Sequence, residues 1–284
     1  MSRDALVLDD VTVCYRRTPA VHHLSATLEC GTLTALMGPN GAGKSTLLRA
    51  ILGWQPLTTG GITLGGVPAR RALRRISYLP QRSAVDWDFP ITVREVVAMG
   101  RYQSRGLFAR FTAADHAAVE DALTEMDLAW LQDRQIAQLS GGQQQRTFLA
   151  RAVASGADVF LLDEPFVGLD PTSTADLVQR LNTWAAQGRL VVAVVHDVAL
   201  ARAHFQEALL VARSLVAAGP VAATLADANL ARAYGAAWPL ARPQADQALA
   251  LPDLGGVLRA QARSAPRPAA QPGTSAVRPA ERRP

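Results

Sequence analysis

A glycine-rich loop at residues 38–45 constrains this chain more than any other feature. The loop has the spacing G-x-x-x-x-G-K-S. It lies between an apolar run at 32–37, predicted to be a buried strand, and a predicted helix at 44–52. Glycines let backbone N–H groups surround a phosphate chain, and the helix N-terminus adds positive potential. The sequence therefore predicts a phosphate-binding site made of Gly38, Pro39, Asn40, Gly41, Ala42, Gly43, Lys44, Ser45 and Thr46.

The lysine of this loop is the only lysine in a chain that has 29 lysines and arginines in all. Everywhere else the sequence uses arginine, whose planar fork is not equivalent to a compact ammonium group. The single exception falls on the position where the cation has to fit as a point charge. We predict that Lys44 contacts the β- and γ-phosphates of a nucleoside triphosphate and that Ser45 binds Mg²⁺.

Two carboxylates follow a second predicted strand. The apolar run 159–162 ends in Asp163 and Glu164, and ligands of open α/β sheets bind at the carboxyl ends of the strands. Two acids at a strand end are by themselves typical of a solvated turn. Together with a phosphate loop, Asp163 is predicted to serve the Mg²⁺ shell and Glu164 to polarise an attacking water.

A third segment, residues 140–143, begins a helix predicted at 143–154. Ser140 and Gln143 have the spacing of a capping box. The glycines between them, Gly141 and Gly142, leave backbone N–H groups unobstructed at a helix N-terminus, which suits an anion. The segment therefore predicts a second phosphate contact in addition to a cap.

Taken in their order along the chain, the three segments resemble those of the ATP-binding subunits of ABC transporters. The resemblance covers roughly residues 5–235, and 140–143 matches the signature motif of that family. It implies an α/β fold: a P-loop ATPase core with a parallel sheet, an antiparallel β subdomain and a helical subdomain. The alternation of strands and helices independently favours a mostly parallel sheet. The ATP-binding domain would span 1–240, with a helical lobe at about 86–150.

Four further residues match the family in the expected order. By resemblance, Tyr15 stacks on adenine, and Gln81 links the γ-phosphate to the membrane partner. Asp170 lies at the dimer contact, and His196 contacts the γ-phosphate. Each also has a structural alternative: Tyr15 could belong to the core, Gln81 and Asp170 to turns, and His196 to a strand-end cap.

The resemblance also implies a mechanism and partners. Two copies of the chain would form a homodimer head to tail, with each ATP between the phosphate loop of one copy and residues 140–143 of the other. Glu164, His196 and Gln81 would be catalytic, and Ser45, Gln81 and Asp163 would bind the Mg²⁺ of MgATP. The partners would be an integral membrane permease and, indirectly, an extracytoplasmic solute-binding protein. No nucleic-acid partner is expected. The subunit would lie peripherally at the cytoplasmic face of the cell membrane.

Residues 85–93, 97–102 and 229–235 resemble one branch of the family, which takes up zinc, manganese or iron chelates. The predicted function is therefore ATP hydrolysis that powers import of a metal ion or an iron chelate through a separate permease. A different class stays open, namely an ABC ATPase that acts as an ATP-driven switch on ribosomes or DNA. Two features disfavour it. Only 95 residues separate Lys44 from Ser140, without sustained heptads, and each motif occurs once.

Composition sets the remaining expectations. The net charge of +5 is carried by residues 257–284, which have six arginines and one glutamate, so the body is neutral and offers no basic nucleic-acid face. The Pro/Ala/Arg-rich tail at 241–284 is expected to be disordered. No apolar run approaches the ~18 residues of a membrane span, and no signal peptide is expected. Cys14 and Cys30 are expected to be small buried residues in a reduced compartment.

Overall fold

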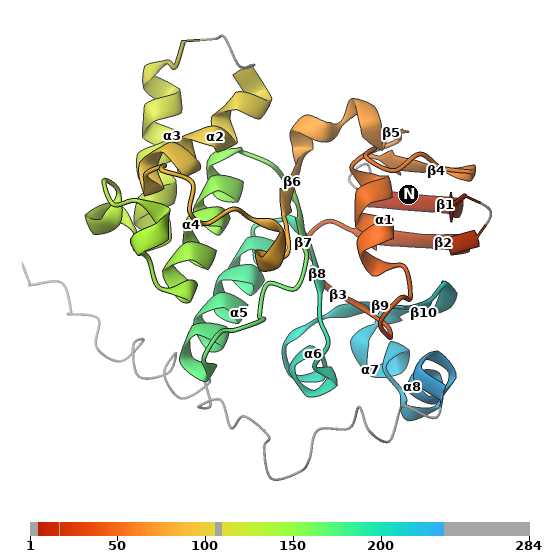
Figure 1. Ribbon diagram of the computed structural model, residues 1–284. Coiled ribbons are helices and arrows are strands. Elements are labelled where there is room, and N and C mark those ends of the chain that lie inside the picture. The colour runs from red at the N-terminus through yellow and green to blue at the C-terminus, as the bar shows by residue number, and fades with distance from the viewer. Residues whose placement is uncertain (1–4, 17, 106–109, 236–284) are drawn as a thin grey trace, which may run out of the picture. The chain divides into compact units, whose positions relative to one another are not determined.

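Two β-sheets organise the part of the chain that the computed structural model describes, residues 5–16, 18–105 and 110–235 (Figure 1). These residues belong to one unit, 1–249. The predicted tail at 241–284 lies outside the described residues.

The larger sheet is mostly parallel, as predicted. Its six strands have the order β10-β9-β3-β8-β7-β6, and only the pairing of β10 with β9 is antiparallel within this sheet. Strands β6 and β7 occupy the residues predicted for them. The strands of this sheet are β3 (Leu33–Met37), β6 (Ile76–Leu79), β7 (Val159–Leu162), β8 (Leu190–Val194), β9 (Glu207–Ala212) and β10 (Ser214–Pro220).

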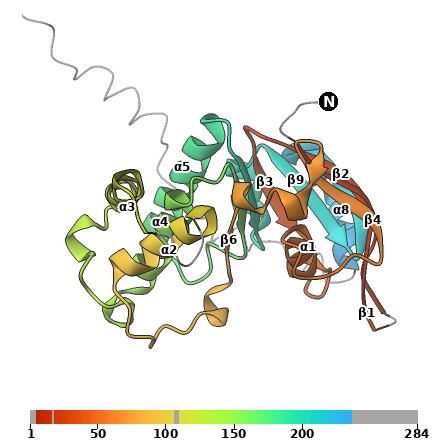
Figure 2. The same ribbon diagram turned by 90° about the horizontal axis from the view of Figure 1, so that it is seen from above.

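Both faces of this sheet are buried, which explains why its central strands are apolar without alternation. In β7, Phe160 and Leu162 pack into one hydrophobic cluster, whereas Val159 and Leu161 pack into another on the opposite face. The first cluster includes residues of helices α2 (Val93–Arg105), α3 (Ala113–Glu125), α4 (Gly141–Ala154) and α5 (Pro171–Ala186). The second includes helix α1 (Lys44–Ile51). Thus α1 and α4 cover opposite faces (Figures 1 and 2).

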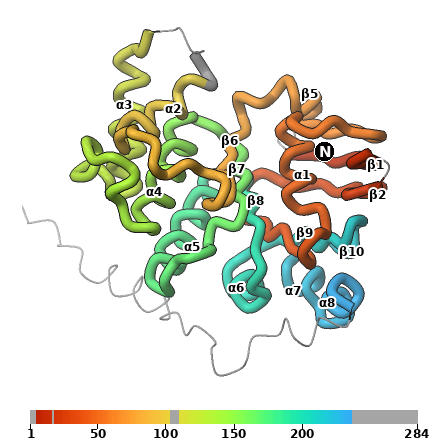
Figure 3. The backbone as a smooth tube through the Cα atoms, in the orientation of Figure 1, coloured from red at the N-terminus to blue at the C-terminus, as the bar shows by residue number. Residues whose placement is uncertain are grey.

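The smaller sheet is antiparallel and has the order β2-β1-β4-β5. Helix α1 contacts β1 and β2, and Figure 3 shows it beside them. This sheet corresponds to the expected antiparallel subdomain. Its strands are β1 (Ala5–Tyr15), β2 (Thr18–Glu29), β4 (Thr59–Leu64) and β5 (Val67–Pro68).

Helices α2, α3 and α4 pack together, and α4 extends four residues beyond the end expected for a helical lobe at about 86–150. A Cβ at Gly100 of α2 would overlap the backbone carbonyl oxygen of Arg151 in α4, so glycine is what allows these two helices to approach closely. Asp115 of α3 is fully buried and is paired with Arg101 of α2 at 2.9 Å. An ion pair therefore joins α2 to α3 in addition to apolar packing.

The sequence did not predict every element. Helix α6 (Val198–His204) was missed, although Asp197 caps it by accepting from the backbone N–H groups of Ala199 and Leu200. The helix predicted at 225–234 corresponds to α8 (Asp227–Tyr234), and the short helix before it, α7 (Val221–Thr224), was also missed. Cys14 and Cys30 are only half-buried, so the expectation that they are buried was wrong. Within the described residues, every helix is too short or too polar to cross a membrane.

Candidate functional site

The phosphate loop joins β3 to α1, as predicted. Two of its glycines are required by close approach and by positive φ. A Cβ at Gly38 (φ 151°) would overlap the carbonyl oxygen of Val211, and one at Gly43 (φ 95°) would overlap that of Ala20. The loop is therefore wedged between β9 and β2, with its backbone fixed before any ligand binds.

Lys44 is the first residue of α1, and only 6% of it is exposed. Its Nζ donates to the carbonyl oxygens of Gly38 at 2.7 Å and Pro39 at 3.0 Å. Burial lowers the pKa of Lys44, and the nearby carboxylates of Glu164 and Asp163 partly oppose that shift. The ammonium is thus held at the loop by two carbonyls, in a space fitted to a compact donor.

Oxygen atoms that could bind a magnesium ion come together at the end of β7. Ser45 Oγ donates to Asp163 Oδ1 at 3.4 Å, and the hydroxyl of Tyr78 donates to Asp163 Oδ2 at 3.3 Å. Asp163 is 4% exposed, and burial raises the pKa of its carboxyl. Hydroxyl and carboxylate oxygens are the donors that Mg²⁺ prefers, so the residues fit this ion.

Three residues predicted to be catalytic come together beside this carboxylate. Gln81 Nε2 donates to Glu164 Oε2 at 2.8 Å, and His196 Nε2 lies 2.8 Å from Glu164 Oε1. Gln81 follows β6, Glu164 follows β7 and His196 follows β8, so the parallel strands bring them to one edge of the sheet. Such an arrangement can orient a water for attack, because the carboxylate accepts its proton while its neighbours hold the carboxylate in place.

Glu164 has a φ of 55°, which is unusual for a residue other than glycine. Its backbone turns sharply after β7 and directs the side chain toward Gln81 and His196. Strained backbone of this kind is concentrated at functional sites.

Residues 140–143 do not meet the phosphate loop within this chain. They form the first turn of α4, on the sheet face opposite to α1. The predicted capping box is present: Ser140 Oγ accepts from the backbone N–H of Gln143, and the side chain of Gln143 accepts from that of Ser140. Gly142 lies beside Ser173 of α5, whose backbone N–H and hydroxyl both donate to the carboxylate of Asp170. Asp170 is therefore a helix cap that lies near the signature segment.

Tyr15 is the last residue of β1, and 44% of it is exposed. It is therefore not a core residue, and its ring is accessible for stacking. It pairs with Thr18 of β2, the strand against which Gly43 is packed.

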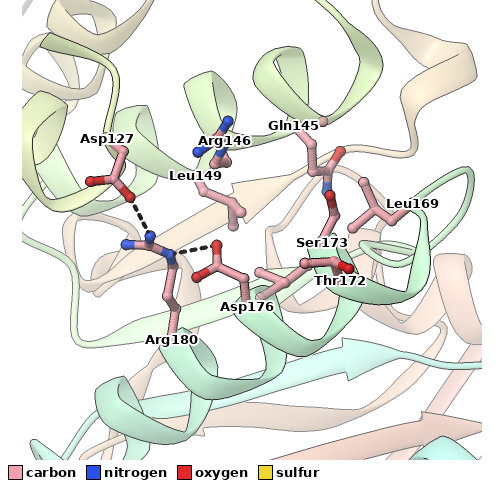
Figure 4. A pocket seen from close by; sticks show the side chains of 11 residues that line it. Asp127, Gln145, Arg146, Leu149, Leu169, Thr172, Ser173, Asp176 and Arg180 are labelled. Carbon is pink, nitrogen blue, oxygen red and sulfur yellow. Dashed lines mark hydrogen bonds and ion pairs between the residues drawn. The ribbon is translucent and has the colours of Figure 1, made fainter. Parts of the chain in front are cut away.

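A cavity of about 330 Å³ lies between α4 and α5, and no residue of the phosphate loop lines it (Figure 4). Gln145 and Ser173 face it, next to the signature segment. At its other end Arg180 is bonded to Asp127 and Asp176, at 2.7 and 3.0 Å, so this guanidinium is fully engaged. The cavity is separate from the carboxylates of the site.

Sequence reasoning missed two residues near the site, Tyr78 and Arg82. Tyr78 lies in the segment 78–81, and its position two residues after Ile76 puts it on the α1 face of β6. Arg82 Nη2 donates to Gln144 at 2.8 Å, and its guanidinium occupies the space beside the missing side chain of Gly141. The alternation of side chains along a strand could have identified Tyr78. For Arg82, the available signal was Gly141, whose missing side chain leaves room for a neighbouring group.

Comparison with known proteins agrees with this geometry. The family model for ABC transporters matches residues 21–167. The zinc transport system ATP-binding protein TroB of Treponema pallidum is 42% identical over 231 residues, covering 81% of this chain and 87% of the relative. The manganese transport system ATP-binding protein MntB of Bacillus subtilis is 42% identical over 228 residues, covering 80% and 91%.

Solved structures agree as well. One, provisionally described as a metal-chelate type ABC transporter in an inward-facing conformation, superposes with a TM-score of 0.72 at 29% identity. The match covers 81% of this chain and 89% of that one. A nucleotide-free ATP-binding cassette from an ABC transporter shares the fold, with a TM-score of 0.68 at 18% identity over 88% of this chain and all of the other. The chain therefore belongs to the ABC transporter family, as one of its ATP-binding proteins, and is an ATPase.

Proposed function

We propose that this ATPase powers the import of zinc or manganese ions through a separate membrane permease, with an iron chelate as the second choice of cargo. The support for the cargo is about 40% identity to zinc and manganese transport proteins over some 80% of the chain. The relatives reported above act in transport systems, so the alternative of a switch on ribosomes or DNA is not favoured.

The observation that carries the chemistry is the Glu164 carboxylate, held between Gln81 and His196 at the carboxyl edge of the sheet. In the proposed reaction, Glu164 accepts a proton from water as the water attacks the γ-phosphate. His196 and Gln81 orient the carboxylate and the water, and Lys44 neutralises charge that develops on the phosphate oxygens.

Ser45, Asp163 and Gln81 are the proposed ligands of magnesium. When bound there, Mg²⁺ would neutralise the β- and γ-phosphate oxygens. Asp163 keeps one oxygen directed toward Ser45, so the protein contributes a fixed carboxylate and not a mobile one.

A head-to-tail homodimer is part of the proposal. The support for it is that the two segments predicted to bind phosphate lie on opposite faces of the sheet. The loop before α1 is on one face, and the first turn of α4 is on the other. In the proposed dimer, two antiparallel copies bring the two segments together, since each copy gives its loop to one ATP and its signature segment to the other.

A groove of about 550 Å³ is the proposed seat of the permease. It lies between α1 and the helical lobe, and it is lined by Arg49, Trp54, Tyr78, Met99 and Arg151, among others. No carboxylate lines it, so it suits a short amphipathic segment that carries an acidic side chain. The subunit would then lie at the cytoplasmic face of the membrane, with the solute-binding protein on the opposite side.

The cargo is tested by deleting the coding sequence and growing cells under metal chelation. We expect poor growth that is restored by added zinc, manganese or iron and by a plasmid copy of the wild-type protein. A Glu164→Gln copy should not restore growth, which ties the phenotype to ATP hydrolysis. If no metal restores growth and the cellular metal content is unchanged, the cargo is wrong while the ATPase assignment stands.

A further inference from the structure

Tyr78 connects three parts of the fold. Its hydroxyl donates to Asp163 Oδ2 at 3.3 Å, and its ring contacts the ring of Trp54 edge to face, with centroids 5.2 Å apart. Its carbonyl oxygen accepts from Arg151 Nη2 at 3.2 Å. The side chain of Tyr78 is thereby joined to the end of β7 and to the segment after α1, and its backbone carbonyl is joined to the signature helix α4.

The two oxygens of Asp163 have different partners. Oδ1 faces Ser45, and Oδ2 faces Tyr78. A carboxylate with a donor at one oxygen has lost its freedom to rotate, so its other oxygen keeps a fixed direction. The tyrosine hydroxyl therefore determines how Asp163 presents Oδ1 on the side of Ser45.

The ring of Tyr78 is contacted by Trp54, a residue that lines the proposed permease groove. Trp54 is 62% exposed, and together with Tyr78 and Arg151 it lines the groove of about 550 Å³. Whatever occupies the groove meets Trp54 and Arg151, both of which contact Tyr78 directly. A single side chain thus separates the groove from the buried carboxylate.

We propose that Tyr78 is a positioning residue that orients Asp163 for the magnesium of MgATP and that Trp54 holds Tyr78 in place from the groove. This inference rests on the proposed function, because it needs Asp163 to serve the metal. It adds a connection between the groove and the metal that does not pass through Gln81.

The test measures ATP affinity of the full-length chain with Mg²⁺ and with EDTA, by titration calorimetry. Tyr78→Phe keeps the ring and removes only the hydroxyl. In wild type, we expect Mg²⁺ to increase the affinity for ATP. In Tyr78→Phe this increase should be smaller by a factor on the order of 10, the effect typical of removing a group that orients a metal ligand. Affinity in EDTA and the melting temperature should not change. Tyr102→Phe, in the exposed part of α2, is the matched control and should behave as wild type.

A second variant tests the role of the groove. Trp54→Leu should also reduce the gain in ATP affinity on adding Mg²⁺ (the magnesium gain), but by a smaller factor than Tyr78→Phe. Combined with Tyr78→Phe it should add nothing, because both act through the same hydroxyl. Full additivity would overturn the part assigned to Trp54.

Asp163→Asn separates this inference from the proposed function. If Asp163→Asn abolishes the magnesium gain and Tyr78→Phe leaves it intact, the positioning role is overturned while the proposed metal site stands. If Asp163→Asn also leaves it intact, both fail. If Tyr78→Phe weakens ATP equally with and without Mg²⁺, its role is structural and the inference is wrong.

Discussion

At the scale of single residues, the site depends on a few side chains that are held by neighbours rather than by regular structure. Glu164 leaves its strand with a positive φ and ends between two partners. Lys44 is enclosed by the carbonyls of its own loop. Both residues are thus set in their working positions by short contacts, and small chemical changes at either should have large effects.

Glu164→Gln should stop hydrolysis and preserve ATP binding. The amide keeps the shape of the side chain and loses the proton acceptor, which costs roughly 10²–10⁴-fold in rate for a general base. The variant should accumulate as an ATP-bound dimer, seen by size-exclusion chromatography with and without nucleotide. Turnover near the wild-type rate would show that Glu164 is not the base.

Lys44→Arg should impair nucleotide binding nearly as much as Lys44→Ala. The ammonium sits between two carbonyl oxygens at 2.7 and 3.0 Å, and a guanidinium is too wide to donate from that point. Equilibrium binding of a fluorescent ATP analogue measures the loss. Arg74→Lys, the reverse exchange at an exposed position, is the control and should be neutral. Affinity within a few-fold of wild type in Lys44→Arg would contradict the prediction.

At the scale of elements, helix ends carry much of the chemistry. The first turns of α1, α4 and α5 hold Lys44, the signature segment and the Asp170 cap respectively. The bonds from Ser173 lower the pKa of the Asp170 carboxyl, so it stays ionised as a cap. Asp170 thus has two candidate roles, one for helix stability and one, from the family resemblance, at the dimer contact.

Two substitutions of Asp170 separate these roles. Serine is a good N-cap, so Asp170→Ser should retain the melting temperature, whereas Asp170→Ala should lower it. Both remove the carboxylate, and both should reduce ATPase activity if it serves the dimer. Thermal unfolding and steady-state hydrolysis are measured on the same samples. Activity that survives in Asp170→Ser would leave only the capping role.

The sequence predicted elements well where local chemistry specifies them. Strand β7 is a short apolar run that ends in two acids, and the spacing of Ser140 and Gln143 predicted the start of α4 to within two residues. Helix α6 was missed because its seven residues directly follow a strand, and the Asp197 cap is its only strong local signal. Contacts such as Tyr78 with Asp163 join residues 85 positions apart, so no local pattern encodes them.

At the scale of the whole molecule, the parallel sheet divides the nucleotide site. Its carboxyl edge gathers Gln81, Glu164 and His196, while its two faces keep α1 and α4 apart. The motifs could be predicted from the sequence, and so could the fold class. Their distribution over two faces is a property of the folded chain, and in the proposed dimer it is the reason that each complete site takes parts from two chains.

Mixing two inactive variants tests this arrangement. Ser140→Arg damages the signature segment, and Lys44→Ala damages the loop. A mixed dimer has one complete site and one with both defects. Random pairing of equal amounts should restore about a quarter of wild-type ATPase activity, because half the dimers are mixed and each has one working site. Differential affinity tags confirm that mixed dimers form. Mixed dimers without activity would contradict independent shared sites.

The solitary lysine has a consequence for chemical labelling. Reagents that modify amines find one ε-amino group in this protein, and it lies in the phosphate loop, mostly enclosed and with a lowered pKa because of burial. Apart from the α-amino terminus, any acylated product therefore reports on that loop alone. Mass spectrometry of the peptide that contains Lys44, with and without ATP, would then measure the fraction of molecules shielded by nucleotide, without mutation and without a tag.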